Sequence, residues 1–146
     1  MQTDPLAHAM SEVEARCDAI EECYEFMLGF AGKGLPNDEG SPVRSYLERA
    51  VDALNGLTQS FAEIIEKQRI EPGGTYQTFL HVLQRDAADS LAALNLVLAQ
   101  PAISSQLIDN LNASIHFRAL LTDIFLIDGA LNERLKKNPV TAEQFE

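Results

Sequence analysis

Apolar residues recur three and four positions apart along four long stretches of this chain. This spacing places side chains on one face of an α-helix and is typical of helices that pack in a bundle. The first stretch contains Leu6, Met10, Val13, Cys17, Ile20, Tyr24 and Met27. The second contains Val43, Leu47, Ala50, Leu54, Leu57, Phe61 and Ile64, and the third Tyr76, Leu80, Leu83, Ala87, Ser90, Leu94 and Val97. The pattern predicts an all-α protein.

Capping residues and helix breakers give the limits of these helices. Asp4 before Pro5 and Ser41 before Pro42 are N-cap and first-turn pairs, and glycine or proline clusters follow the stretches. We predict helices over about 5–31, 42–69, 76–100 and 104–137, with a loose tail at 139–146. Gly56 falls inside the second helix, where glycine costs about 1 kcal/mol relative to alanine.

The stretch from 104 to 137 is the longest and the most apolar. It has no internal proline and one glycine, Gly129, and as one helix it would span about 50 Å. Two neighbouring apolar rows run along it, which is more than one core-facing stripe. We therefore predict a homodimer through this fourth helix. The residues expected at the interface are Phe117, Leu120, Ile124, Ile127 and Leu131.

The connections between the four stretches are short, and none is long enough to require a crossover. With 146 residues, the chain fits a single domain, 1–146, which can bury a core without disulfides or metals. We predict an up-down-up-down four-helix bundle with a long C-terminal fourth helix.

Charge narrows the classes of partner. The formal net charge is −11, and residues 1–31 carry seven acids and one base. Such a surface repels nucleic-acid phosphates and anionic lipid headgroups, so we expect neither nucleic acid nor membrane as a partner. The sequence has no signal-peptide pattern and no apolar run of membrane-spanning length, which predicts a soluble, cytoplasmic protein.

The two cysteines are predicted to be unreactive. Cys17 falls in the first apolar row, which indicates a small buried side chain. Cys23 has acidic neighbours, which should raise the pKa of its thiol. They lie six residues apart on one helix and cannot form a disulfide within it.

No metal, cofactor or catalytic pattern is present. The residues three positions before His8, His81 and His116 are Pro5, Thr78 and Ala113, so the Glu-x-x-His step of di-iron bundles is missing. Phosphate-loop, nucleophile-elbow and zinc-protease motifs are also missing. We predict no catalytic residue, no metal and no cofactor, and activity as an enzyme is not expected.

A few polar residues lie on or beside the apolar rows. They are Arg118, Asp86, Asp128, His81 and Tyr76. Buried charges are seldom unpaired, so a structural Arg118–aspartate pair is the interpretation that we favour. The alternative is an internal ligand pocket in which Arg118 holds an anionic group.

These observations give two hypotheses for function. The leading one is a non-enzymatic interaction protein (adaptor, chaperone-like or regulatory) that binds itself and possibly another protein. The alternative is a small-molecule-binding bundle with a polar pocket around Arg118, ahead of a metal-dependent enzyme.

Overall fold

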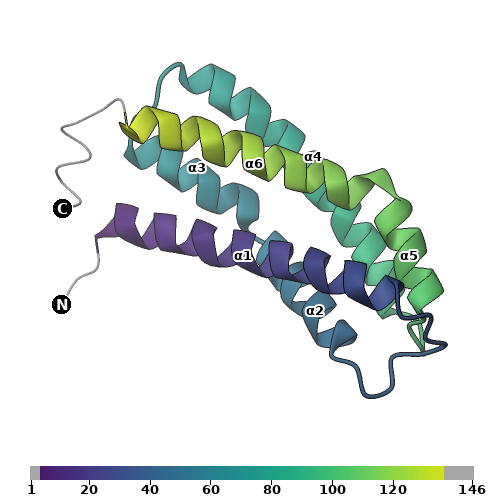
Figure 1. Ribbon diagram of the computed structural model, residues 1–146. Coiled ribbons are helices and arrows are strands. Elements are labelled where there is room, and N and C mark those ends of the chain that lie inside the picture. Colours follow the sequence, from purple (N-terminus) through teal and green to yellow (C-terminus); the bar gives the residue numbers. More distant parts are fainter. Residues whose placement is uncertain (1–3, 137–146) are drawn as a thin grey trace.

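The computed structural model describes residues 4–136, and all regular secondary structure in that range is α-helical (Figure 1). The helices are α1 (Pro5–Ala31), α2 (Val43–Leu54), α3 (Leu57–Lys67), α4 (Gly73–Leu98), α5 (Ser105–Ala113) and α6 (Ile115–Lys136). Asp4 caps α1, since its Oδ1 accepts a hydrogen bond from the Leu6 N–H at 3.1 Å. The all-α prediction is confirmed. No described helix has an apolar stretch that could cross a membrane. The predicted tail at 139–146 lies outside the described residues.

The helices pack around one continuous core. α1 lies against α2, α3 and α5, while α4 lies against α6 and also touches α2, α3 and α5 (Figure 1). The predicted apolar rows supply most of this core, and its largest fully buried side chains include Phe30, Phe61, Phe117, Leu47, Leu83 and Leu94. α1 and α6 are different, because their backbones hardly approach each other closely.

The predicted helix 42–69 is wrong as a single element, because it is broken between α2 and α3. Asn55 is extended and Gly56 has φ +111°, a left-handed conformation that favours glycine. Nη1 of Arg16, on α1, donates hydrogen bonds to the carbonyls of Asp52, Ala53 and Asn55 at 3.1, 3.0 and 2.8 Å. The guanidinium thus caps the end of α2, whose last carbonyls have no helical donor.

The predicted helix 104–137 is also wrong as a single element. Ser114 is extended, with ψ 148°, and separates α5 from α6. Each part then buries its own apolar face: α5 buries Ile108 and Leu111, and α6 buries the row that begins at Phe117. The break lets the apolar sides of α5 and α6 face the core independently of each other.

Hydrogen bonds fix the loop between α1 and α2 and the loop between α4 and α5. The buried Ser105 hydroxyl donates to the Phe30 carbonyl at 2.6 Å and accepts from the Leu35 N–H at 2.9 Å. Arg44 donates to the carbonyls at the end of α4, and Asp38 accepts from the Ile103 N–H at 2.9 Å. That hydrogen bond lowers the pKa of Asp38. These hydrogen bonds anchor the two loops to each other and to the ends of α1 and α4.

Candidate binding groove between α1 and α6

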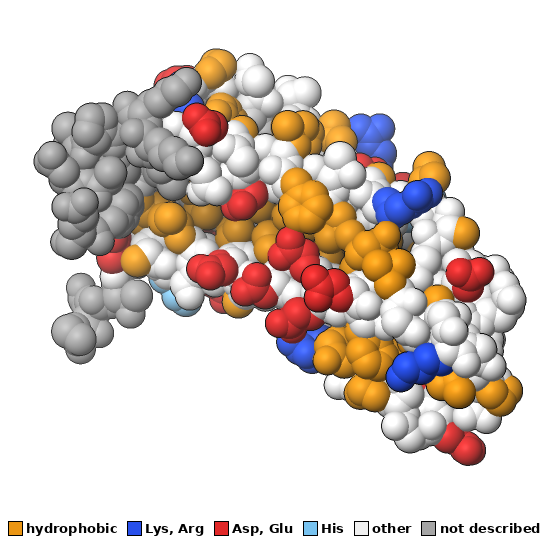
Figure 2. Space-filling view, viewed as in Figure 1, with side chains coloured by type: hydrophobic (Ala, Val, Ile, Leu, Met, Phe, Trp, Pro, Cys, Tyr) orange, Lys and Arg blue, Asp and Glu red, His pale blue; other side chains and the backbone are white. Residues whose placement is uncertain are grey.

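A groove of about 350 Å³ lies between α1 and α6, with α3 beneath it. α3 provides the buried floor residues Phe61 and Ile64. The apolar lining from the two walls consists of Met10, Val13 and Cys17 on α1 and Ile124, Phe125 and Leu131 on α6. Figure 2 shows this apolar band between the two helices.

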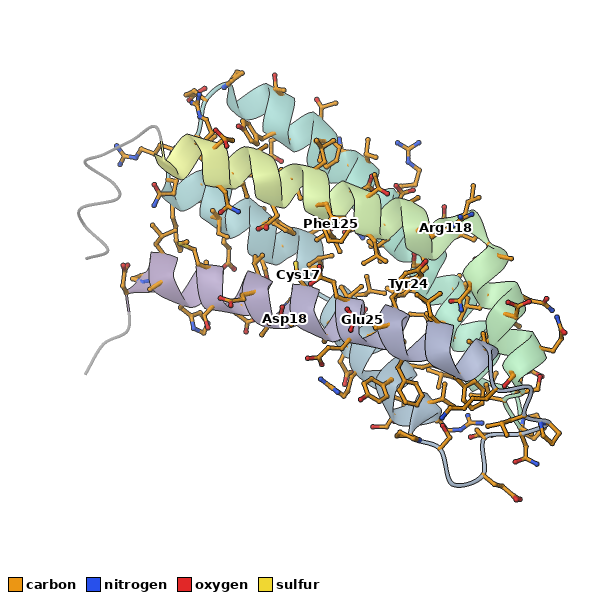
Figure 3. The ribbon with its side chains drawn as sticks, in the orientation of Figure 1. Cys17, Asp18, Tyr24, Glu25, Arg118 and Phe125 are labelled. Carbon is orange, nitrogen blue, oxygen red and sulfur yellow. The ribbon has the colours of Figure 1, made fainter. Side chains whose placement is uncertain are left out.

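Aromatic side chains set the limits of the groove. At one end, the rings of Tyr24 and Phe117 stack with their centroids 5.9 Å apart and join α1 to α6. Phe125 lies on the rim, 58% exposed, although it is a large apolar side chain. Cys17, Tyr24 and Phe125 all lie between the two helices (Figure 3). The groove is thus closed at the Tyr24 end and open along the rest.

Acidic side chains border this apolar floor. Glu14, Asp18 and Glu21 follow each other four and three positions apart along α1, and Asp128 lies on α6. No lysine or arginine is among the lining residues. Figure 2 shows acidic side chains along the α1 side of the apolar band. Burial and the nearby charges of Asp18 and Asp128 raise the pKa of Glu21, so these carboxylates repel one another.

Cys17 lies in the groove, and its chemistry is suppressed. Burial raises the pKa of the Cys17 thiol to about 12, with further contributions from Asp128, Glu21 and Asp18. Cys23 is the fully buried cysteine, and burial raises the pKa of its thiol to about 12 as well. Cys17, which the sequence predicts to be buried, is only partly buried. Neither thiol is ionised near neutral pH, so neither is an activated nucleophile.

The five residues of the predicted ligand site do not converge. Asp128 borders the groove, whereas His81 lines a separate hollow of about 380 Å³ between α3 and α4. Tyr76 is partly buried against the core. Arg118 is exposed and forms no ion pair with any described residue. The favoured Arg118–aspartate pair is therefore not formed, and Arg118 does not line the groove.

Asp86 of α4 lies beside Asp123 of α6. Burial, followed by hydrogen bonding to Asp86 and repulsion from its charge, raises the pKa of Asp123 to about 7. Two carboxylates can share a hydrogen bond only when one of them is protonated. Oδ2 of Asp123 is buried without a partner among the described residues. We therefore expect the contact between α4 and α6 to be sensitive to pH.

The five residues predicted at the dimer interface all lie in the core of this chain. Phe117, Leu120, Ile124, Ile127 and Leu131 are each at most 4% exposed. The homodimer stays a prediction, and any such dimer would have to use other residues of α6. Among the α6 side chains whose burial the structure describes, the large apolar ones that are exposed are Ile115, Phe125 and Leu126.

The sequence prediction missed the role of Phe125. It lies on the second apolar row of the fourth predicted helix, beside Asp128, and this row is the sequence feature that could have identified it.

Within the described part of the chain, no group of three or more His, Cys, Asp or Glu side chains could hold a metal ion. Comparisons with protein families, characterised proteins and solved structures find no match to this chain.

Proposed function

We propose that this protein is a non-enzymatic interaction protein, an adaptor or regulatory bundle, that binds a helical segment of a partner in the groove between α1 and α6. We also infer that the six helices form an up-down-up-down four-helix bundle. In that arrangement α2 and α3 together form the second helix of the bundle, and α5 and α6 together form the fourth. The single-residue connection at Ser114 and the packing of α1 against α2 and α3 support it.

The observation that carries the functional proposal is the open groove between α1 and α6 beyond the stacked Tyr24 and Phe117 rings. Neighbouring helices in a bundle usually bury a shared apolar face. Here the two walls diverge over an apolar floor and leave Phe125 58% exposed. A third helix lying in this space would complete the packing, which is the helix-in-groove mode of recognition.

A second copy of this chain fits the groove less well than another protein does. Pairing two copies through α6 would bring the acidic residues of both grooves together, and the net charge of each copy is −11. Like charges brought together at an interface cost several kcal/mol. The homodimer predicted from the sequence is therefore the competing proposal, and the oligomeric state in solution distinguishes it.

Site-specific photo-crosslinking in cells of the source organism tests this function. A photoreactive phenylalanine analogue replaces Phe125 in the groove, and in a control protein it replaces Leu126, which is 61% exposed but does not line the groove. We expect one polypeptide to crosslink to position 125 and not to position 126. The crosslinked segment, synthesised as a peptide, should bind the unmodified protein.

Two results would overturn the proposal. One is the same set of weak crosslinks at both positions, which would mean that the groove has no dedicated occupant. The other is a crosslink from position 125 to a second copy of this chain, accompanied by a stable dimer in sedimentation velocity. That result would establish the homodimer in place of the partner complex.

A further inference from the structure

We propose that the segment bound in this groove is a basic amphipathic helix, with lysine or arginine side chains placed against the acidic border. This inference rests on the proposed function of the groove and identifies the chemistry of its occupant. Two independent features carry it, the apolar floor and the arrangement of the acidic residues.

The dimensions of the groove suit a short helix. The lining of α1 runs from Met10 to Glu21, which is about 16 Å along a helix axis, and that of α6 from Ile124 to Asn132, about 12 Å. Two to three turns of helix match these lengths. The stacked Tyr24 and Phe117 rings block one end, so the bound helix must extend toward the other.

The floor determines the apolar side of the partner. Phe61 and Ile64 are buried beneath the groove, and Phe125 is exposed on its rim. A helix that places apolar side chains at spacings of three and four would fill the space over this floor. Phe125 would then become buried against the apolar face of the partner.

The acidic border determines the charge of the partner. Glu14, Asp18 and Glu21 form a row along α1, and Asp128 borders the groove on α6. Glu14 and Glu21 directly follow apolar seam residues of α1, at positions where a coiled-coil helix carries the charged residues that select its partner. Besides burial, the charges of Asp18 and Asp128 contribute to the raised pKa values of Cys17 and Glu21, so like charges repel one another along this border. Lysine or arginine side chains would relieve this repulsion, whereas an acidic or neutral helix would not.

Three synthetic 14-residue helical peptides with the same apolar face test the inference. Their flanking positions carry lysine, glutamine or glutamate, and fluorescence anisotropy measures each affinity at low and high salt. We expect the lysine peptide to bind at least tenfold more tightly than the glutamine peptide, and the glutamate peptide to bind most weakly. Salt should weaken the binding of the lysine peptide, because it screens charges at this range.

Matched variants locate the binding. Asp18→Asn with Asp128→Asn removes two charges from the groove, and Asp89→Asn with Asp109→Asn removes two exposed charges elsewhere. We expect at least a fivefold loss of affinity for the lysine peptide in the first protein and less than a twofold loss in the second. Phe125→Ala should also weaken binding at least fivefold, whereas Leu126→Ala should have less than a twofold effect.

The outcomes separate this inference from the proposed function. Equal affinities for the three peptides, all sensitive to Phe125→Ala, would leave the groove as a binding site but overturn its preference for a basic helix. If the affinity for the lysine peptide is unchanged by Phe125→Ala and by removal of the groove charges, the peptide is attracted to the acidic surface in general. That result also overturns the inference. Failure of all three peptides to bind overturns it too, while the crosslink from position 125 still tests the function.

Discussion

Replacing Arg16 with methionine should destabilise the protein through the break between α2 and α3. Its guanidinium donates to three backbone carbonyls at 2.8 to 3.1 Å, and Nε forms an ion pair with Glu12 at 3.1 Å. Methionine keeps most of the apolar stem but removes every donor. The perturbation therefore isolates the polar contribution of the side chain.

The expected loss follows from the surroundings of those bonds. A hydrogen bond from a charged donor contributes about 1.5 to 3 kcal/mol. Only the bond to Ala53 is partly shielded, whereas the carbonyls of Asp52 and Asn55 are exposed and can bind water instead. The ion pair with Glu12 is also partly exposed and adds less than about 1 kcal/mol. We expect Arg16→Met to lower the free energy of unfolding by about 2 to 3 kcal/mol.

Urea unfolding followed by circular dichroism measures this difference. Arg118→Met is the matched control, because it removes the same charge from an exposed arginine that forms no ion pair with the described residues. Its effect should be within about 0.5 kcal/mol of zero. If the two variants unfold at the same urea concentration, Arg16 does not hold the break and the reasoning fails.

Three further predictions concern titration, buried polarity and thiol chemistry. The pKa of Asp123 is about 7 in the folded protein against 3.8 for an ordinary aspartate, so the folded state holds a proton that the unfolded state releases between about pH 4 and 7. Stability should fall as the pH rises through this window, and Asp123→Asn should flatten that part of the urea-unfolding profile; an unchanged slope would contradict the assignment. Ser105→Ala leaves the Phe30 carbonyl and the Leu35 N–H without their side-chain partner and should lower the free energy of unfolding by about 1 to 3 kcal/mol. The control Ser45→Ala, at an exposed serine, should lower it by less than about 0.5 kcal/mol. Similar values for the two variants would contradict the role of the buried Ser105 hydrogen bonds. In a Cys23→Ala protein, iodoacetamide should alkylate Cys17 at pH 8 at least tenfold more slowly than it does in urea, because the pKa of the folded thiol is about 12; equal rates would refute that pKa.

The sequence was sufficient for the core but not for the helix breaks. The spacing of Leu47 and Leu83 within their rows predicts their burial, since helical periodicity alone decides which side faces inward. The break at Gly56 involves Arg16, which is forty residues away in the sequence and approaches through tertiary packing. Local propensity treats Gly56 as a tolerable helix residue, so no local pattern reveals the break.

The candidate site was only partly predictable for a related reason. The second apolar row on the fourth predicted helix indicates apolar side chains outside the core, and Phe125, which belongs to that row, is exposed. The break at Ser114 changes which residues of the row remain exposed. Arg118 falls on the same row in a straight helix but lies outside the groove in the structure. Its sequence position therefore suggested a pocket that the packing does not form.

Mapping the lysine peptide on the protein by NMR tests the central claim most directly. Saturating amounts of peptide are added to isotope-labelled protein, and the chemical shifts of the backbone amides are followed. The account predicts that the large shifts fall within residues 10–21 of α1 and 124–132 of α6, and that the outer face of α4 around Leu96 is unaffected. Shifts concentrated on α4 or in the hollow around His81 would show that the groove between α1 and α6 is not the binding site.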